Sequence, residues 1–313
     1  MSSIKLKSGA EVLVTDHIAH SPDFNFMAGG KGIDGIYSSY VIRDASLSNF
    51  VEFINEHRLR DISFQYGLEI GSPITVVLNQ IDSYSSLRSV SFDLLADVDF
   101  DIANKRELEF CQIRKLRVVG KFPPGSLKID KLAKNLDEFE ASFDVLADDS
   151  LDFTQTRTLR MYDAPNVGAA NEVSKYKSLR RLHFDSCAIR DSAKSEKLVD
   201  LEILIFAGCK QLQNLAPLAR SKSIRHLVVS ECPKVRDWNF LLEMPELKSL
   251  RITKAIDPSI INKLQNLEFL HIEKPAKKDL VTSFSKGGAA RFGRVVNAGL
   301  GLLEQDGTLG RVL

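Results

Sequence analysis

Three cysteines are the residues of this 313-residue chain whose spacing first suggests chemistry. Cys187, Cys209 and Cys232 follow one another at intervals of 22 and 23 residues. Zinc sites built from cysteine use clustered C-x-x-C spacing and tetrahedral convergence, and this spacing offers neither. The near-equal intervals instead predict one column of equivalent positions in a repeat, where a buried thiol acts as a small apolar group. We therefore expect the three thiols to be buried, reduced and free of metal, and we expect no cofactor.

Other patterns with catalytic potential are weak. The stretch 27–32 (MAGGKG) is rich in glycine but lacks the GxxxxGK[S/T] spacing of a phosphate-binding loop, so we interpret it as a flexible loop. None of the six histidines belongs to an H-E-x-x-H motif, and no G-x-S-x-G elbow occurs. The run Arg291-Phe292-Gly293-Arg294 is interpreted as a solvated terminus rather than a nucleic-acid contact. These absences predict a protein that is not an enzyme.

A repeated apolar pattern, L-x-x-L-x-L with L standing for any large apolar residue, organises most of the chain. Its clearest copies begin at Leu179, Leu201, Ile224 and Leu247, at intervals of 22, 23 and 23 residues. Further copies begin at 87, 113 and 267, degenerate ones at 136 and 156, and a weaker one at 59. A fixed period in this range is typical of a solenoid, in which each unit covers the apolar edge of its neighbour.

The repeats resemble the leucine-rich repeat family, whose consensus continues L-x-x-L-x-L-x-x-(N or C)-x-L. Cys187, Cys209 and Cys232 occupy the ninth position of three consecutive copies, and the stretch 212–252 is similar to the short-repeat, internalin-like bacterial type. The resemblance implies an α/β solenoid, a horseshoe with one curved parallel sheet on its concave face. It implies strands centred near residues 89, 115, 138, 158, 181, 203, 226, 249 and 269. Such folds host many functions, so the resemblance does not identify a partner.

The repeats divide the chain into three parts. Residues 1–56 are expected to form an N-terminal cap, with a hairpin around Ser8-Gly9, a strand within 36–44 and a helix within 46–57 capped by Ser46. Residues 57–275 carry the repeats. Residues 276–313 contain seven glycines, which disfavour a helix. This last segment is expected to be either a C-terminal cap or a partly disordered tail.

Composition limits the surroundings in which the chain works. The formal net charge is +1, which gives no general attraction to nucleic acid or to an anionic membrane. No stretch of 18 apolar residues without charge occurs, and no apolar run follows residues 1–7. Four cysteines in 313 residues suggest a reducing compartment. We expect a cytoplasmic monomer that binds neither nucleic acid nor membrane.

The third and fifth positions of each copy should point outward from the sheet, and they predict a binding surface. At 115–160 these positions carry Lys and Arg opposite Glu, so that stretch should neutralise itself. Farther along, Ile203, Ile205 and Val228 are apolar at outward positions. The candidate partner-binding residues are Tyr162, Arg181, His183, Ile203, Ile205, His226, Val228 and Arg251. An apolar centre with an Arg and aromatic rim is typical of a protein-binding hot spot. The substitution Ile205→Asp should then weaken binding and leave the fold intact.

The sequence thus predicts a protein-binding leucine-rich repeat protein with no catalytic activity. Its partner should be another protein whose surface is neutral to acidic with an apolar centre. Among bacterial proteins of this kind, an immunity protein that neutralises a toxin is the first hypothesis. Four alternatives stay open: an adaptor or effector, an enzyme whose site joins residues 1–56 to the solenoid rim, a purely structural scaffold, and coverage of the outward positions by residues 1–56 or 276–313.

Overall fold

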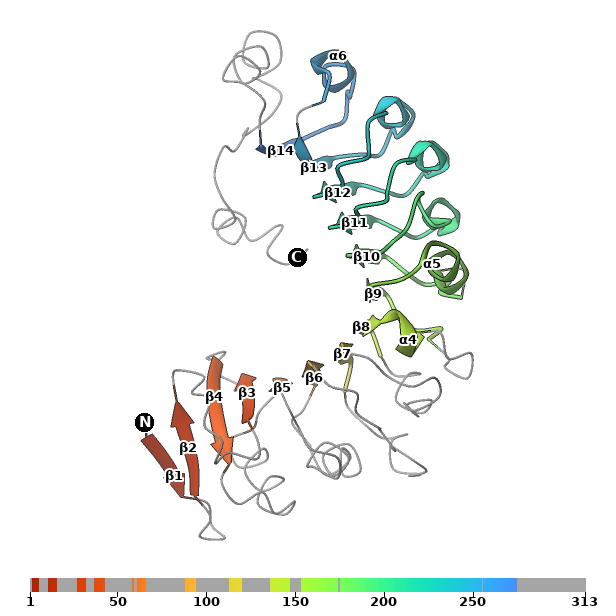
Figure 1. The fold of residues 1–313 in the computed structure, drawn as a ribbon. Coiled ribbons are helices and arrows are strands. Elements are labelled where there is room, and N and C mark those ends of the chain that lie inside the picture. Colours follow the sequence, from red (N-terminus) through yellow and green to blue (C-terminus); the bar gives the residue numbers. More distant parts are fainter. Residues whose placement is uncertain are drawn as a thin grey trace. The chain divides into compact units, whose positions relative to one another are not determined.

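The computed structural model describes eleven stretches of the chain and one isolated residue. They are residues 2–5, 11–15, 27–31, 37–42, 58, 61–65, 88–93, 113–119, 136–146, 153–173, 175–254 and 256–274. The chain divides into two compact units, Met1–Tyr162 and Asp163–Leu313 (Figure 1). In the part of the chain that the structure describes, no helix is both long and apolar enough to cross a membrane.

The first unit begins with four antiparallel strands. β1 (Ser2–Lys5) pairs with β2 (Glu11–Thr15), which confirms the expected hairpin, and β2 pairs with β4 (Tyr37–Ile42). β3 (Met27–Lys31) pairs with β4 on one side and with β5 (Asp61–Gln65) on the other (Figure 1). The interpretation of residues 27–32 as a flexible loop is therefore wrong. Gly29 and Gly30 disfavour a strand by their residue type. The segment is nevertheless a strand, because β4 and β5 form hydrogen-bonded ladders along its two edges.

The other described strands of the first unit are parallel repeat strands. They are β5, β6 (Ser89–Asp93), β7 (Lys115–Val119), β8 (Glu138–Ser142) and β9 (Thr158–Tyr162). Each pairs with the next so that equivalent repeat positions face each other, as Asp61 faces Ser89 and Lys115 faces Glu138. The weak copy beginning at 59 is thus a true repeat strand. The helix expected within 46–57 and the tail 276–313 lie outside the described residues.

The degenerate copy beginning at Thr156 shows how a polar residue can occupy an apolar position. Thr156 is completely buried, and its hydroxyl donates a hydrogen bond of 3.1 Å to the carbonyl of Leu136, the first residue of the preceding copy. A buried hydroxyl is tolerated when it finds a partner of this kind. The repeat frame therefore continues through a copy that lacks the apolar residue of the pattern.

Five further parallel strands form the sheet of the second unit. They are β10 (Arg181–Asp185), β11 (Ile203–Ala207), β12 (His226–Ser230), β13 (Ser249–Lys254) and β14 (Phe269–Lys274). Again each repeat position faces its equivalent, from Arg181 opposite Ile203 to Ser249 opposite Phe269. The expected fold class, an α/β solenoid of parallel leucine-rich repeats, is confirmed.

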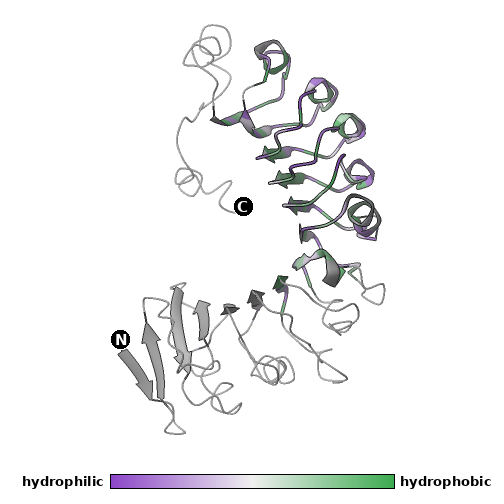
Figure 2. Ribbon diagram, in the orientation of Figure 1, coloured by the Kyte–Doolittle hydropathy of each residue, from purple (hydrophilic) through white to green (hydrophobic). Residues whose placement is uncertain are grey.

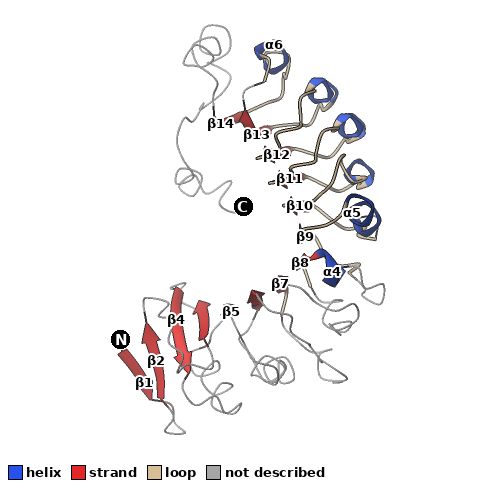
Figure 3. Cartoon of the chain, viewed as in Figure 1, coloured by secondary structure: helices blue, strands red, loops and turns tan. Residues whose placement is uncertain are grey.

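Short helical turns return the chain from one strand to the next. In the second unit they are α5 (Asn166–Val173), η3 (Ser195–Lys197), η4 (Ala216–Arg220), η5 (Asn239–Glu243) and α6 (Pro258–Ile261) (Figure 3). The η turns are 3-10 helices of three to five residues. Pro217 stands near the start of η4, where a missing N–H costs nothing. A return of this length suits a repeat of 20–23 residues.

The core lies between the strands and these return segments. Hydrophobic residues recur there from repeat to repeat (Figure 2). The inward positions of the central copy, Leu201, Leu204 and Phe206, have no exposed surface. The ring of Phe206 stacks on Phe184 of the preceding copy, with centroids 5.3 Å apart and planes 6° apart. Burial of each such side chain contributes about 1.5–3 kcal/mol, which is available only when the neighbouring repeat is present.

Candidate functional site

Seven of the eight predicted binding residues share one face of the sheet in the second unit. The third positions place Arg181 beside Ile203 and Ile203 beside His226. The fifth positions place His183, Ile205, Val228 and Arg251 in a second row. Strands in such a sheet lie about 4.8 Å apart, so side chains of one row contact each other directly. The two rows together are called the outward patch below.

The eighth predicted residue, Tyr162, belongs to a charged cluster in the first unit. Its hydroxyl donates a hydrogen bond of 3.1 Å to Glu140 and accepts one from Arg117. The guanidinium carbons of Arg117 and Arg160 lie 5.2 and 4.9 Å from the centre of its ring. Burial, followed by the charge of Glu140, raises the pKa of Tyr162 above its ordinary value. These contacts hold the Tyr162 ring as part of the packing of its own unit.

The burial of two residues corrects the expectation that every side chain of the outward patch faces solvent. The exposed fraction of Ile205 is only 2% and that of Val228 is 8%, so neither side chain is open to solvent. Arg181, Ile203 and His226 are half-buried. An outward strand position is not the same as a solvent position, because side chains of neighbouring strands and any segment on that face occupy the surface around it. His183 and Arg251 are half-buried as well, so the patch is accessible except at Ile205 and Val228.

The basic rim expected around the patch is partly neutralised. Nε of Arg251 donates a hydrogen bond of 3.1 Å to Glu273, and Nε2 of His183 lies 4.0 Å from a carboxylate oxygen of Asp185. The columns of third and fifth positions leave out Asp185 and Glu273, which are seventh positions of their repeats. Arg181 and His226 both lie at half-buried third positions, where a partner can reach them.

The seventh positions form a polar network that the sequence analysis missed. The hydroxyl of Ser230 donates to both oxygens of Glu273, at 2.9 and 3.1 Å, and the hydroxyl of Thr253 donates to one of them at 3.0 Å. Burial acts to raise the pKa of Glu273, but these hydrogen bonds and the charge of Arg251 outweigh it and lower the pKa. Ser230, Thr253 and Glu273 are successive members of one column, so an alignment of the seventh positions would have found them.

The cysteine column has the expected burial. Cys187, Cys209 and Cys232 are buried and carry free thiols. Each thiol donates to the carbonyl at the end of its own strand, at 3.4 Å for Cys187, 3.5 Å for Cys209 and 3.2 Å for Cys232. Hydrogen bonds with the other two thiols, together with burial, raise the pKa of Cys209. A buried, protonated thiol is a poor nucleophile. Cys111 lies outside the described residues.

The charged rows of the first unit neutralise themselves, as their alternating signs predicted. Nζ of Lys115 lies 2.9 Å from Glu138 and 3.1 Å from Glu140, and Arg117 binds Glu140 at 3.0 Å. Burial acts to raise the pKa of Glu140, but Lys115 and Arg117 outweigh it and lower the pKa. Among the described residues, no group of three His, Cys, Asp or Glu side chains is arranged to hold a metal ion. Cross-strand pairing of repeats is the role that these charges fulfil.

The half-buried His226 and the buried His271 make stability depend on pH. Burial lowers the pKa of His226 and of His271, and the charge of Arg251 adds to this effect at His271. Below about pH 6.5 the unfolded chain binds protons that the folded histidines do not, so the free energy of unfolding should fall as the pH falls. Glu140 and Glu273, whose pKa values are lowered, should add a second loss below about pH 4.5.

Urea unfolding at about pH 7.5 and about pH 5.5 checks the histidine contribution. The double variant His226→Asn, His271→Asn should show a smaller difference between these two conditions than the unchanged chain does. An identical difference in both proteins would assign the pH dependence to other groups.

Solved structures of similar form include the following three. An internalin from Listeria monocytogenes is 17% identical, with 79% of this chain and 68% of that chain covered and a TM-score of 0.45. A leucine-rich repeat protein from Leptospira interrogans is 15% identical, with 63% of each chain covered and a TM-score of 0.31. The PEPR1–AtPEP1 complex is 13% identical, with 63% and 36% covered and a TM-score of 0.26. No protein-family model and no curated protein sequence matches this chain.

The assignment of the fold rests on the geometry of this chain itself. Equivalent positions of successive copies face each other in parallel ladders within each unit. The ninth positions form a column of buried cysteines, and 3-10 turns return the chain between strands. Parallel strands that recur every 20–28 residues, with this cysteine column, give the protein a leucine-rich repeat fold.

Proposed function

We propose that this chain is a non-catalytic protein-binding module that recognises its partner through the outward patch of the second unit. The observation that carries the proposal is the row of third positions, where half-buried Ile203 lies between Arg181 and His226. An aliphatic side chain between a guanidinium and an imidazole offers apolar contact together with directed hydrogen bonds. Arg and apolar anchors of this kind carry much of the energy of protein interfaces.

The charges of the row favour a partner whose surface is neutral to acidic with an apolar centre. Burial lowers the pKa of His226, so this side chain is neutral near pH 7 and Arg181 carries the positive charge. Ile205 and Val228 occupy the neighbouring row of fifth positions and are buried in the free chain, so they support the surface rather than form it. The first candidate for the partner is a bacterial toxin, which would make the chain a cytoplasmic immunity protein. An adaptor role uses the same surface.

The double variant Arg181→Ala, Ile203→Ala tests the surface. Truncating two anchors should weaken partner binding by about 2 kcal/mol or more, which is about thirty-fold in Kd. The partner is first isolated by co-purification with the tagged chain, and the affinities are then measured by titration calorimetry. The matched control is Arg220→Ala, Leu242→Ala, which removes an exposed arginine and an exposed leucine from the return segments η4 and η5.

One outcome would contradict the proposed binding surface, and another would contradict the proposed immunity role. Equal affinities for the unchanged chain and for Arg181→Ala, Ile203→Ala would place the binding surface elsewhere. For the immunity role, expression of the isolated partner alone should arrest growth, and co-expression with the unchanged chain should restore it. A partner that is harmless when expressed alone would leave a binding module in an adaptor role and remove the toxin hypothesis.

A further inference from the structure

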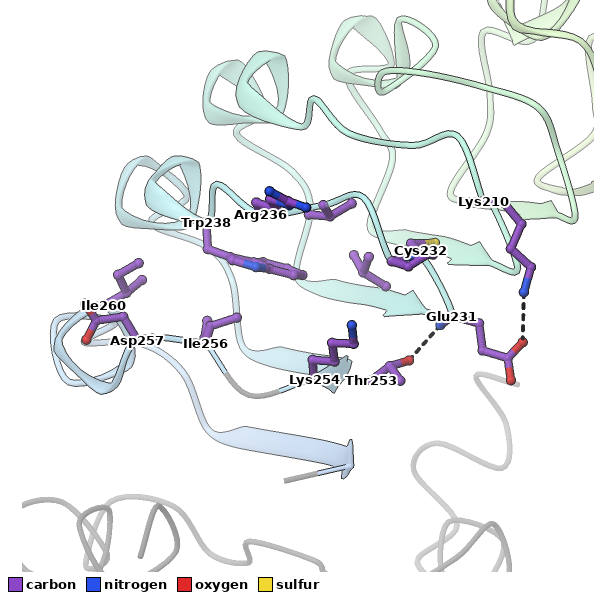
Figure 4. A pocket seen from close by; sticks show the side chains of 13 residues that line it. Lys210, Glu231, Cys232, Arg236, Trp238, Thr253, Lys254, Ile256, Asp257 and Ile260 are labelled. Atoms are coloured by element: carbon purple, nitrogen blue, oxygen red, sulfur yellow. Dashed lines mark hydrogen bonds and ion pairs between the residues drawn. The ribbon is translucent and has the colours of Figure 1, made fainter. Parts of the chain in front are cut away.

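A hollow of about 580 Å³ opens at the end of strands β12 and β13, away from the outward patch. Figure 4 shows the side chains that surround it. Its walls consist of apolar residues, one indole ring and a rim of charged groups. They are Lys210, Val229, Glu231, Cys232, Pro233, Val235, Arg236, Trp238, Thr253, Lys254, Ile256, Asp257 and Ile260. None of these is among the eight residues predicted for partner binding.

The hollow arises where the repeat becomes shorter. Residues 231–248 connect β12 to β13, whereas only residues 255–268 connect β13 to β14. After β10, β11 and β12 the chain turns at a residue with positive φ, namely Ser186 at 56°, Gly208 at 64° and Glu231 at 52°. The equivalent residue after β13, Lys254, instead continues the strand. The next repeat therefore supplies less chain to cover the flank of the one before it.

The inner wall of the hollow is apolar. Val229, Cys232, Val235 and Ile256 form it and retain between 3% and 8% of their exposed surface. Trp238 is only half-buried, and its ring stacks on Phe240 with centroids 6.1 Å apart. The other face of such an indole is a large flat surface suited to an aromatic ring. The volume is within the range of pockets that bind small molecules.

Two cations of the charged rim form no ion pair with another described residue. Glu231 lies 4.0 Å from Lys210, and the carboxylate of Asp257 accepts the backbone N–H of Ser259 at 2.8 Å. Arg236 and Lys254 also line the hollow, and neither forms an ion pair with a described residue. Three cations and two carboxylates give the rim a net positive charge.

We propose that this hollow binds a small aromatic monocarboxylate. The aromatic body would stack on Trp238 and displace water from the apolar wall, and the carboxylate would pair with Arg236 or Lys254. Charge-assisted hydrogen bonds of this kind are about twice as strong as neutral ones, and partial burial at the mouth of a pocket strengthens them. The proposal is independent of partner binding at the outward patch.

The tryptophan supplies the readout, because Trp238 is the only tryptophan of the chain. Titration of the full chain with 4-phenylbutyrate should change the Trp238 emission in a saturable way. The neutral analogue 4-phenylbutanamide should bind at least about tenfold more weakly, since it keeps the ring and loses the charge. The double variant Arg236→Ala, Lys254→Ala should lose the preference for the acid. The control Arg220→Ala, Lys222→Ala removes two exposed cations outside the hollow and should keep the preference for the acid over the amide.

Three results would overturn the proposal. One is the absence of any saturable change with 4-phenylbutyrate at millimolar concentration. Another is equal affinity for the acid and the amide in the unchanged chain. The third is a response to a short peptide ending in phenylalanine but none to 4-phenylbutyrate, which would assign the hollow to a polypeptide C-terminus. The variant Ile260→Phe adds bulk to one wall and should abolish the change; its far-UV circular dichroism confirms that it folds.

Discussion

Leu204→Ala is expected to lower the free energy of unfolding by about 2–5 kcal/mol. Leu204 is the inward fourth position of β11, has no exposed surface, and lies between Leu182 and Leu227 of the adjacent repeats. Truncation removes apolar burial and leaves a cavity that two neighbouring strands cannot collapse to fill. Urea unfolding followed by circular dichroism measures the change.

Leu242→Ala is the matched control for this substitution. Leu242 retains 41% of its exposed surface, so the same chemical change should cost under about 1 kcal/mol. If both variants have the same unfolding midpoint, the inward assignment of Leu204 is wrong. The comparison cancels general effects of a leucine-to-alanine change on the unfolded chain.

Ile205→Asp should destabilise the fold by about 3–5 kcal/mol, the cost of a buried charge without a partner. From the sequence alone we expected this variant to fold normally and to lose only partner binding. The structure reverses that expectation, because Ile205 is 2% exposed and lies between His183 and Val228 in its row. A carboxylate there loses its hydration and also replaces apolar contact.

Val199→Asp is the control for the buried charge, since Val199 retains 78% of its exposed surface. The free energy of unfolding of this variant should lie within about 0.5 kcal/mol of the unchanged chain. A stable Ile205→Asp protein would show that the position opens to solvent in solution. It would also restore Ile205 as a direct contact for a partner.

The sequence was sufficient to predict which side chains are neighbours. In a ladder of parallel strands each repeat position faces its equivalent, so an alignment of the copies is also a contact map. The pairs Lys115–Glu138 and Ile205–Val228 follow from this rule, and the structure confirms them. The cysteine column follows in the same way. Even the polar network of Ser230, Thr253 and Glu273 was present in the alignment, in the column of seventh positions.

Features that depend on long-range pairing required the structure. The stretch Met27–Lys31 contains two adjacent glycines and has no strand pattern of its own. It becomes strand β3 because β4 and β5 pair with its two edges. Likewise, Tyr162 was named from the sequence among the candidate partner-binding residues. Its partners Arg117 and Glu140 come from two preceding repeats, and they make it part of a charged cluster.

The sequence by itself determined the repeat register, the direction of each side chain and the pairing of equivalent positions, because all three follow from a period that local composition reveals. The tertiary structure decided how much of each outward side chain remains accessible, as at Ile205, and where a hollow opens, as beside Trp238. Accessibility depends on the bulk of everything packed around a position, and the hollow depends on a connection that is shorter than the one before it. Neither quantity is a property of one repeat, so each became visible only when the repeats were stacked.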